Sequence, residues 1–404
     1  MNVVRGVIGV VILGLIAFLC SNNRKGIRYR PVLCSLAVQV IFAFLVLQWA
    51  PGRAVLNGLS AKAQTLIGYA NQGIAFLFGG LVKANGPSIF ALQVLPVIIF
   101  LASLIGILYY LRVIQWVISI LGGAIARVIG TSQLESLSAA ATVFLGQSEA
   151  PLLIRPYVAG LTRAELFQAM TSGFTSVAGS TLVGYALLGV PLPYLLTASV
   201  MTAPAGLVMA KLMFPETERP RAGKEIQIAA DTTSANVIDA AATGALDGLR
   251  LAVNVGALLL AFISIIALLN GLLSGAGGLF GHPDVTLQKI LGFILAPVAF
   301  AIGVPWSEAV TAGGFLGEKT VLNEFVAYVS FAPRIHTLSP KTVIIVTFAL
   351  CGFANFTSIA IQIGTLGSLA PERRGDVARY GLRALLAATL ANLSNAAIAG
   401  MFVG

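Results

Sequence analysis

The chain has 404 residues, of which 57% are hydrophobic and only 10% are charged, with a mean hydropathy of +0.92. Because a soluble domain carries about 25% charged residues, this composition excludes a soluble globule and predicts that lipid is the solvent for much of the surface. The formal net charge of +10 does not indicate nucleic-acid binding, since the basic residues lie between apolar segments and form no stripe interleaved with aromatic side chains.

Eight segments are apolar and long enough to cross a bilayer core, which takes about 20 residues. They cover approximately residues 3–20, 32–50, 91–111, 164–189, 192–213, 247–272, 341–365 and 376–402. The first is short and could suit a signal peptide, but no convincing small-residue cleavage site follows it. We therefore interpret it as a spanning helix, and an even number of spans places both termini on one side.

Basic residues gather in three short loops, 24–30, 219–224 and 373–379, which an eight-span count puts on the same side of the membrane. The loop 273–285 falls on the opposite side and contains no Lys or Arg. Since short cytoplasmic loops are enriched in Lys and Arg, we predict that the three basic loops are cytoplasmic and that both termini lie outside.

Four further apolar stretches do not fit as crossings. Residues 62–86 and 112–130 are amphipathic, as expected of helices that lie at the membrane interface. Residues 133–160 and 304–335 each consist of two short apolar arms around a polar, charged middle. An arm of about a dozen residues reaches only partway across a bilayer, so we interpret the two as re-entrant hairpins, the first hairpin and the second hairpin.

The order of these elements predicts an internal repeat. Span, interfacial helix, hairpin and two further spans occur once in 91–213 and again in 247–404, and an odd number of crossings per unit inverts the second relative to the first. Inverted repeats with interrupted helices are typical of secondary transporters. We thus predict an all-α polytopic fold with N-terminal scaffold helices and an interfacial helix in 1–90, two repeats, and a cytoplasmic linker, 214–246.

Two carboxylates, Glu149 and Glu324, interrupt the hairpins at matching places. An ionised carboxylate at mid-membrane is costly and persists only with partners or water, so we interpret both as functional. The alternative for each is a structural ion pair or a helix cap.

Neutral polar residues accompany the two carboxylates. Gln147, Ser148 and Asn323 lie at the hairpin tips, while 353–358 and 172–181 place polar and glycine residues inside the seventh and fourth spans. Such runs indicate local unwinding that lines a cavity, although a membrane hydroxyl can also bond only to its own backbone. Nucleophile–base motifs are absent, so no enzyme is expected. A passive channel for small polar solutes is the alternative, but it needs a continuous polar path rather than one cluster.

Several motifs resemble the concentrative nucleoside transporters, bacterial short form. They are Gly146–Pro151, Gly303–Trp306 with Glu308, Asn323–Tyr328, Cys351–Ala360, and Gly364–Pro371 followed by Arg373–Asp376. The resemblance implies a cation-coupled nucleoside symporter in the bacterial inner membrane, where the termini that the basic loops place outside would be periplasmic. It also implies a homotrimer whose transport domain moves against a scaffold domain like an elevator.

The resemblance further implies a role for particular residues. The first hairpin tip, Gln147, Ser148 and Glu149, would face the nucleobase with Thr181 nearby. The ribose would lie against Glu324, Asn355 and Ser358, with Phe353 beside the ligand. A carboxylate suits vicinal hydroxyls, an amide suits a base edge, and an aromatic ring forms a wall.

Ion coupling is implied by the same resemblance. The residues at the family's sodium positions are Thr142, Leu145, Ser148, Ser176 and Val177, and Thr142 replaces an Asn. Hydroxyls and carbonyls suit a hard cation, but one carbonyl-type donor is missing. The coupling ion is therefore Na+ or H+, with H+ slightly favoured, and no other cofactor is expected.

Overall fold

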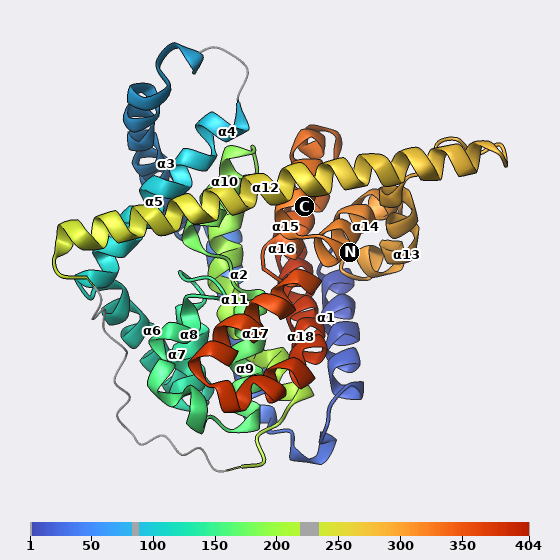
Figure 1. The fold of residues 1–404 in the computed structure, drawn as a ribbon. Helices are drawn as coiled ribbons and strands as arrows, with labels where there is room; N and C mark the ends of the chain where they lie inside the picture. Colours follow the sequence, from blue (N-terminus) through green and yellow to red (C-terminus); the bar gives the residue numbers. More distant parts are fainter. Residues whose placement is uncertain (1, 83–88, 219–233, 404) are drawn as a thin grey trace.

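The structure, a computed structural model, describes residues 2–82, 89–218 and 234–403, and within these ranges it contains helices but no strand (Figure 1). Five described helices are long and apolar enough to span a membrane, and the pair α13 and α14 meets the same test only together, with a bend of 116°. The prediction of an all-α polytopic protein is confirmed. The count of eight crossings stays a prediction, because the remaining spans are short or broken.

The N-terminal helices are α1 (Asn2–Leu19), α2 (Tyr29–Leu47) and α3 (Ala50–Phe78). The amphipathic segment expected over 62–86 is the second part of the longer α3, and residues 83–86 lie outside the described residues. Helix α1 packs on α18 (Arg374–Met401), and α2 packs on α11 (Leu192–Met213). The segment 1–90 is therefore divided in its packing. Helices α1 and α2 lie against α18 and α11 at the C-terminal ends of the two repeats, whereas α3 contacts α5 near the start of the first repeat.

The two repeats have the same order of elements. The first contains α4 (Phe90–Gln93), α5 (Leu95–Tyr110), α6 (Val113–Ile129), α7 (Gln133–Ala141), α8 (Ala150–Leu153), the 3-10 helix Arg155–Gly160, α9 (Arg163–Thr175), α10 (Gly179–Leu187) and α11. The second contains α12 (Val237–Gly278), α13 (Leu287–Ala301), α14 (Trp306–Val321), α15 (Glu324–Phe331), the 3-10 helix Ala332–Thr337, α16 (Pro340–Leu350), α17 (Phe356–Leu369) and α18.

Local sequence explains where the buried helices begin. Ser132 with Glu135 and Thr162 with Glu165 form capping boxes at α7 and α9, which satisfy backbone N–H groups that have no partner inside the helix. The second arm of the first hairpin is less regular than expected, because Pro151 and Pro156 limit it to one α-helical turn and a 3-10 helix.

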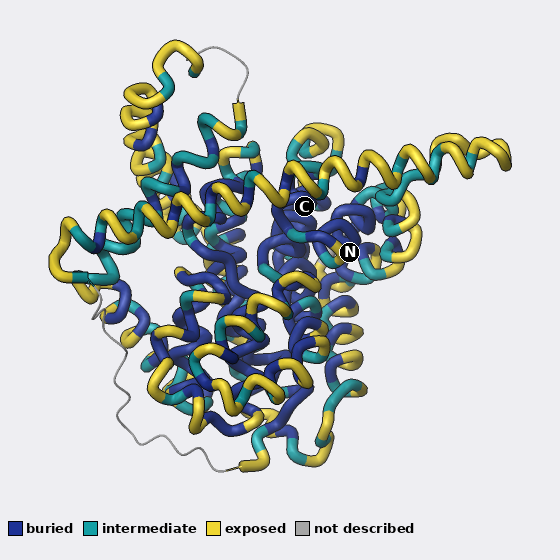
Figure 2. The backbone as a smooth tube through the Cα atoms, viewed as in Figure 1, coloured by how far each residue is buried: buried dark blue, intermediate teal, exposed yellow. Residues whose placement is uncertain are grey.

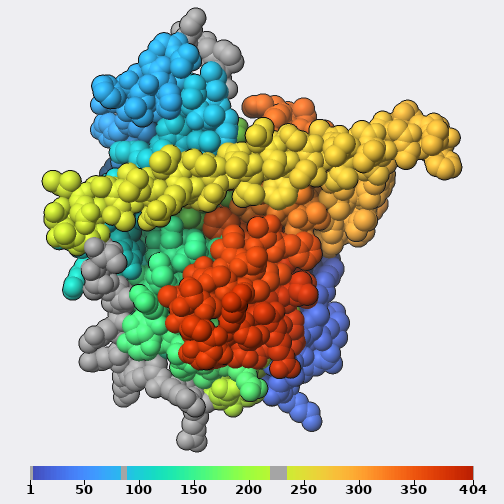
Figure 3. Space-filling model, viewed as in Figure 1, coloured from blue at the N-terminus to red at the C-terminus, as the bar shows by residue number. Residues whose placement is uncertain are grey.

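Helix α12 is longer than the predicted span 247–272. It begins at Val237, where the side chain of Asn236 accepts hydrogen bonds from the N–H groups of Ile238 and Asp239. The predicted linker 214–246 is thus wrong in its last part, which is helical, and residues 219–233 lie outside the described residues. Helix α12 runs across one face of the molecule (Figure 3).

Helix α12 packs closely on α5, and small residues make this possible. A Cβ atom at Gly244 would lie 2.7 Å from the carbonyl oxygen of Ala102, and one at Gly248 would lie 2.8 Å from the Cα atom of Ile99. Glycine at such positions lets two membrane helices approach closely. Helix α12 is exposed along most of its length, whereas α9, α11, α16 and α18 are mostly buried (Figure 2).

Two spans are interrupted as predicted. The fourth span breaks between α9 and α10 at Ser176–Ala178, and the seventh breaks between α16 and α17 at Cys351–Asn355. These breaks fall in the polar runs 172–181 and 353–358, so the predicted unwinding is confirmed.

Candidate functional site

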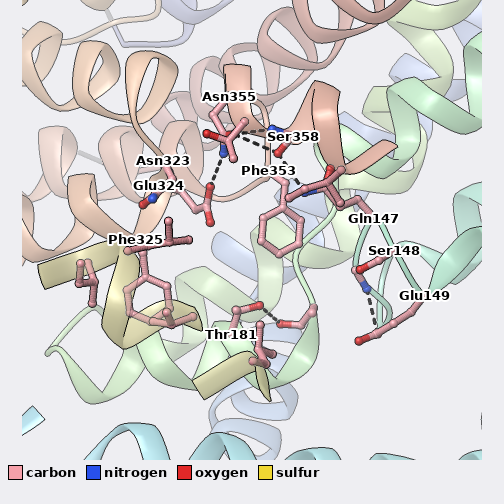
Figure 4. Close-up of a pocket in the computed structure, with 18 residues that line it drawn as sticks. Gln147, Ser148, Glu149, Thr181, Asn323, Glu324, Phe325, Phe353, Asn355 and Ser358 are labelled. Carbon is pink, nitrogen blue, oxygen red and sulfur yellow. Dashed lines mark hydrogen bonds between the residues drawn. The ribbon is translucent and has the colours of Figure 1, made fainter. Parts of the chain in front are cut away.

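One cavity of about 180 Å³ collects the residues that the sequence singles out (Figure 4). Its polar lining comes from the first hairpin tip, the start of α15, the start of α17 and α10. All eight candidate substrate residues line it: Gln147, Ser148, Glu149, Thr181, Glu324, Phe353, Asn355 and Ser358. Leu251, Val255, Leu258 and Leu259 of α12 form an apolar wall. A few converging polar groups in a mostly apolar pocket are typical of a small-molecule site.

The Glu324 carboxylate is buried and held from two sides. The Tyr185 hydroxyl donates to Glu324 Oε1 at 3.1 Å, and the Asn355 amide donates to Glu324 Oε2 at 2.8 Å. Glu324 is also the first residue of α15, whose cap Asn323 accepts from the N–H group of Val326. The partial positive charge of a helix N-terminus favours a carboxylate there. Each oxygen therefore keeps accepting capacity that ligand hydroxyls can use.

A chain of side-chain hydrogen bonds connects the second hairpin to the first. Asn355 Oδ1 caps α17 by accepting from the Ser358 N–H group at 2.9 Å, and it also accepts from the Ser358 hydroxyl at 3.0 Å. Gln147 Nε2 donates to Ser358 Oγ at 2.9 Å, while Gln147 Oε1 is buried and has no partner among the described residues. A buried acceptor of this kind is available to a donor on a ligand.

The two helix breaks contact each other directly. The Phe353 N–H group donates to the Ser176 carbonyl oxygen at 3.1 Å. The first hairpin joins the fourth-span break as well, since the Gly179 N–H group donates to the Phe144 carbonyl oxygen at 3.1 Å. Gly352 has φ +148°, and a Cβ atom there would lie 2.7 Å from the carbonyl oxygen of Thr175. The crossing therefore requires glycine at position 352.

The first hairpin tip is more open than the second. Ser148 is exposed and Glu149 half-buried. The Glu149 carboxylate accepts a hydrogen bond from the nearby Gly146 N–H group at 3.2 Å. Ser148 and Glu149 also line a second cavity of about 500 Å³, next to Asp247 and Arg250 of α12. The Glu149 side chain makes no capping hydrogen bond to α8, and it borders two cavities.

The five candidate cation residues lie around the junction of the first hairpin and the fourth-span break. Thr142, Leu145, Ser176 and Val177 are buried, while Ser148 is exposed. The hydroxyls of Thr142 and Ser176 donate to the carbonyls of Ala139 and Gly173, each at 2.7 Å, so both oxygens can still accept or coordinate. Described residues include no cluster of three His, Cys, Asp or Glu side chains, so this set of neutral oxygens suits a hard monovalent cation better than a transition metal.

Sequence analysis did not identify Tyr185, Phe325 or the α12 wall. Tyr185 lies in an apolar helix and packs against Phe325 and Tyr328, with ring centroids 4.9 and 4.4 Å away. Tyr185 is fully buried, and a buried Tyr O–H usually needs a polar partner, but nothing in the sequence shows this burial.

Three family descriptions match consecutive parts of the chain. "Na+ dependent nucleoside transporter N-terminus" matches residues 8–81, "Nucleoside recognition" matches 91–192, and "Na+ dependent nucleoside transporter C-terminus" matches 194–400. The family resemblance that rests on the sequence motifs is confirmed. The slight preference for protons gains no support, because two of the descriptions name Na+.

Similar proteins extend over the whole chain. An uncharacterized transporter of Bacillus subtilis, YutK, is 56% identical over 100% of both chains. The nucleoside permease NupC of Helicobacter pylori is 44% identical over 98% of this chain and 97% of its own. These relatives and the family descriptions indicate a transporter rather than an enzyme.

Solved structures of CNTnw resemble the fold closely. An inward-facing substrate-bound state is 48% identical, with a TM-score of 0.94, and the match covers 100% of this chain and 98% of that chain. A variant in an outward-facing state matches with a TM-score of 0.96 at 48% identity and the same coverage.

Proposed function

The chain belongs to the Na+-dependent, or concentrative, nucleoside transporter family, and we propose that it imports nucleosides across the bacterial cytoplasmic membrane together with a cation. One observation carries the proposal: all eight candidate substrate residues line a single cavity between the two hairpins. Glu324 would accept hydrogen bonds from ribose hydroxyls, with Asn355 and Ser358 beside it. Gln147, Ser148, Glu149 and Thr181 would face the nucleobase, and Phe353 would cover the ligand.

An elevator-like movement fits the way the cavity is divided. Its polar residues come from the hairpins and broken spans, whereas its apolar wall comes from α12, which packs on α5. A polar cluster can slide past an apolar wall without losing hydrogen bonds to it. The moving unit would contain α1, α2, both hairpins and the broken spans, while α3, α5 and α12 would form the scaffold. This division differs from the expected scaffold 1–90, because α1 and α2 pack on α18 and α11.

Assembly into a homotrimer is part of the proposal. Helix α12 exposes large apolar residues along its length, among them Leu249, Val253 and Leu260, and a surface of this kind is covered by lipid or by another protein. The orientation with both termini outside follows from the basic loops and stays a prediction.

The coupling cation would bind where the first hairpin meets the fourth-span break, at Thr142, Leu145, Ser148, Ser176 and Val177. The name of the family supports Na+, and the neutral oxygen ligands are compatible with it. Thr142 offers one hydroxyl where an Asn would offer an amide carbonyl, so H+ is the competing ion.

Uptake of labelled uridine into proteoliposomes tests the proposal. The purified protein is reconstituted, and Na+ and pH gradients are imposed separately, with protein-free vesicles as the control. We expect saturable accumulation that is driven by one of the two gradients. The absence of uptake under both gradients, or flux that does not saturate, would contradict the proposal, and the second result would favour a channel.

A further inference from the structure

The second hairpin buries three charged side chains close together in sequence. Glu318, Lys319 and Glu324 are 0%, 3% and 5% exposed, and Lys319 is the only buried Lys or Arg among the described residues. Glu318 has its own partners, since Gln288 Nε2 and the Ser330 hydroxyl donate to its Oε1 at 2.9 and 3.0 Å. Lys319 and Glu324 therefore need a separate explanation.

Lys319 connects the second hairpin to the end of α16. Its Nζ donates to the Ala349 carbonyl oxygen at 2.7 Å. Ala349 lies in the last turn of α16, where carbonyls lack partners within the helix and carry partial negative charge. Two residues later the chain unwinds into the Cys351–Asn355 break, which supplies Asn355 to the carboxylate of Glu324.

The ammonium group of Lys319 also interacts electrostatically with the Glu324 carboxylate. The other groups that bond to this carboxylate, the Tyr185 hydroxyl and the Asn355 amide, are neutral donors. A buried carboxylate persists only when charge or hydrogen bonds compensate for its lost hydration. Lys319 is thus the positive charge that offsets Glu324.

We propose that Lys319 is a positioning residue that keeps the nucleoside site electrically neutral and fixes the second hairpin to the C-terminal end of α16. A neutral site that binds an uncharged nucleoside crosses the membrane with only the charge of its coupling cation. A site without Lys319 would carry one extra negative charge, and moving a charge across the membrane is opposed or driven by the membrane potential.

A double-mutant cycle tests the charge pairing without relying on transport. The thermal unfolding midpoint in detergent is measured for wild type, Lys319→Met, Glu324→Gln and the double variant, with Lys319→Arg as the conservative control. We expect Lys319→Met to lower the midpoint strongly, and to lower it much less in the Glu324→Gln background, because no unpaired charge then remains. Additive effects would overturn the proposal. If Lys319→Met does not fold, recovery of folded protein in the double variant supports it, and failure of both contradicts it.

A second measurement rests on the proposed function and separates charge compensation from simple packing. Counterflow of labelled uridine, with saturating cation on both sides, reports movement of the loaded site at imposed membrane potentials. We expect wild type and Lys319→Arg to respond to the potential, and Lys319→Met to lose the response because its loaded site is neutral. An unchanged response in Lys319→Met, or none in wild type, would overturn the proposal. If wild type exchanges no uridine, the proposed function fails, while the unfolding cycle still decides the role of Lys319.

Discussion

The two hairpin tips occupy matching places in an inverted repeat but differ in how they hold their carboxylates. Glu324 is buried, begins a helix, and accepts hydrogen bonds from side chains of two other elements, Tyr185 and Asn355. Glu149 is half-buried, and its carboxylate accepts from the Gly146 N–H group in its own turn. Lys319 offsets the charge at the second tip, whereas the first tip opens toward a larger cavity.

The difference follows from the surroundings of each tip. The second hairpin meets the unwound seventh span, whose cap Asn355 points a donor at the carboxylate. The first hairpin meets the fourth-span break mainly through backbone contacts, such as that of Gly179 with Phe144. We infer that the second tip is a preorganised anchor for the ligand and that the first tip adapts to it. The repeat thus reproduces the backbone path while the chemistry of the two halves diverges.

The largest expected effect comes from Glu324→Gln. The substitution keeps the shape of the side chain but removes its charge and replaces one hydrogen-bond-accepting oxygen by an NH2 donor. The two charge-assisted hydrogen bonds expected from the ribose hydroxyls are therefore lost. At about 1.5–3 kcal/mol for each bond, uridine uptake should fall at least about 100-fold. Initial uptake rates in proteoliposomes measure the effect.

The control for Glu324→Gln is its assembly and folding. Size-exclusion chromatography and the unfolding midpoint in detergent should show a folded protein, so that lost transport reflects the site. Uptake at the wild-type rate by a folded variant would remove Glu324 from the ligand site and would end the comparison between the tips.

Tyr185→Phe tests whether the second tip is preorganised. The variant removes one donor to Glu324 and leaves the ring contacts with Phe325 and Tyr328 in place. Loss of one hydrogen bond to a charged group predicts about tenfold weaker uridine binding or somewhat more, as measured by calorimetry. Tyr157→Phe, at a half-buried tyrosine that does not line the cavity, is the matched control. Equal affinities for Tyr185→Phe and wild type would show that Glu324 does not need this donor.

Much of this comparison could be predicted from the sequence, because it rests on polar residues that interrupt apolar segments. Glu149, Glu324 and Asn355 are conspicuous for that reason, and both helix breaks overlap polar runs. Tyr185 could not be identified in this way, since a tyrosine in an apolar helix also suits simple packing. Lys319 lies next to Glu318 in the sequence, which suggests that the two charges interact with each other. Only the structure shows that Glu318 bonds to Gln288 and Ser330, whereas Lys319 bonds to Ala349. The start of α12 could not be separated from the polar segment before it, because its small residues and single Asp239 do not resemble a long apolar span.

Glu149→Gln should have a smaller effect than Glu324→Gln. The carboxylate is partly exposed, so water already competes for its hydrogen bonds, and we expect uridine affinity to fall about tenfold or less. Calorimetry with uridine and with a purine nucleoside measures the loss, and a difference between the two ligands would indicate contact with the base. A loss as large as that of Glu324→Gln would mean that the tips are equivalent.

Thr142→Asn should have the smallest effect and sharpens the ionic side of the comparison. The variant adds an amide carbonyl beside Ser176 without changing the nucleoside cavity, which Thr142 does not line. Because a hard cation gains an oxygen ligand, the Na+ concentration for half-maximal uptake should fall about threefold, while uridine affinity at saturating cation stays constant. Thr142→Val, which keeps the shape and removes the hydroxyl, should raise that concentration if Na+ binds here. If neither variant changes the response to Na+, and uptake follows the pH gradient alone, the coupling ion is a proton carried by a carboxylate such as Glu149 or Glu324 and not a cation bound at Thr142.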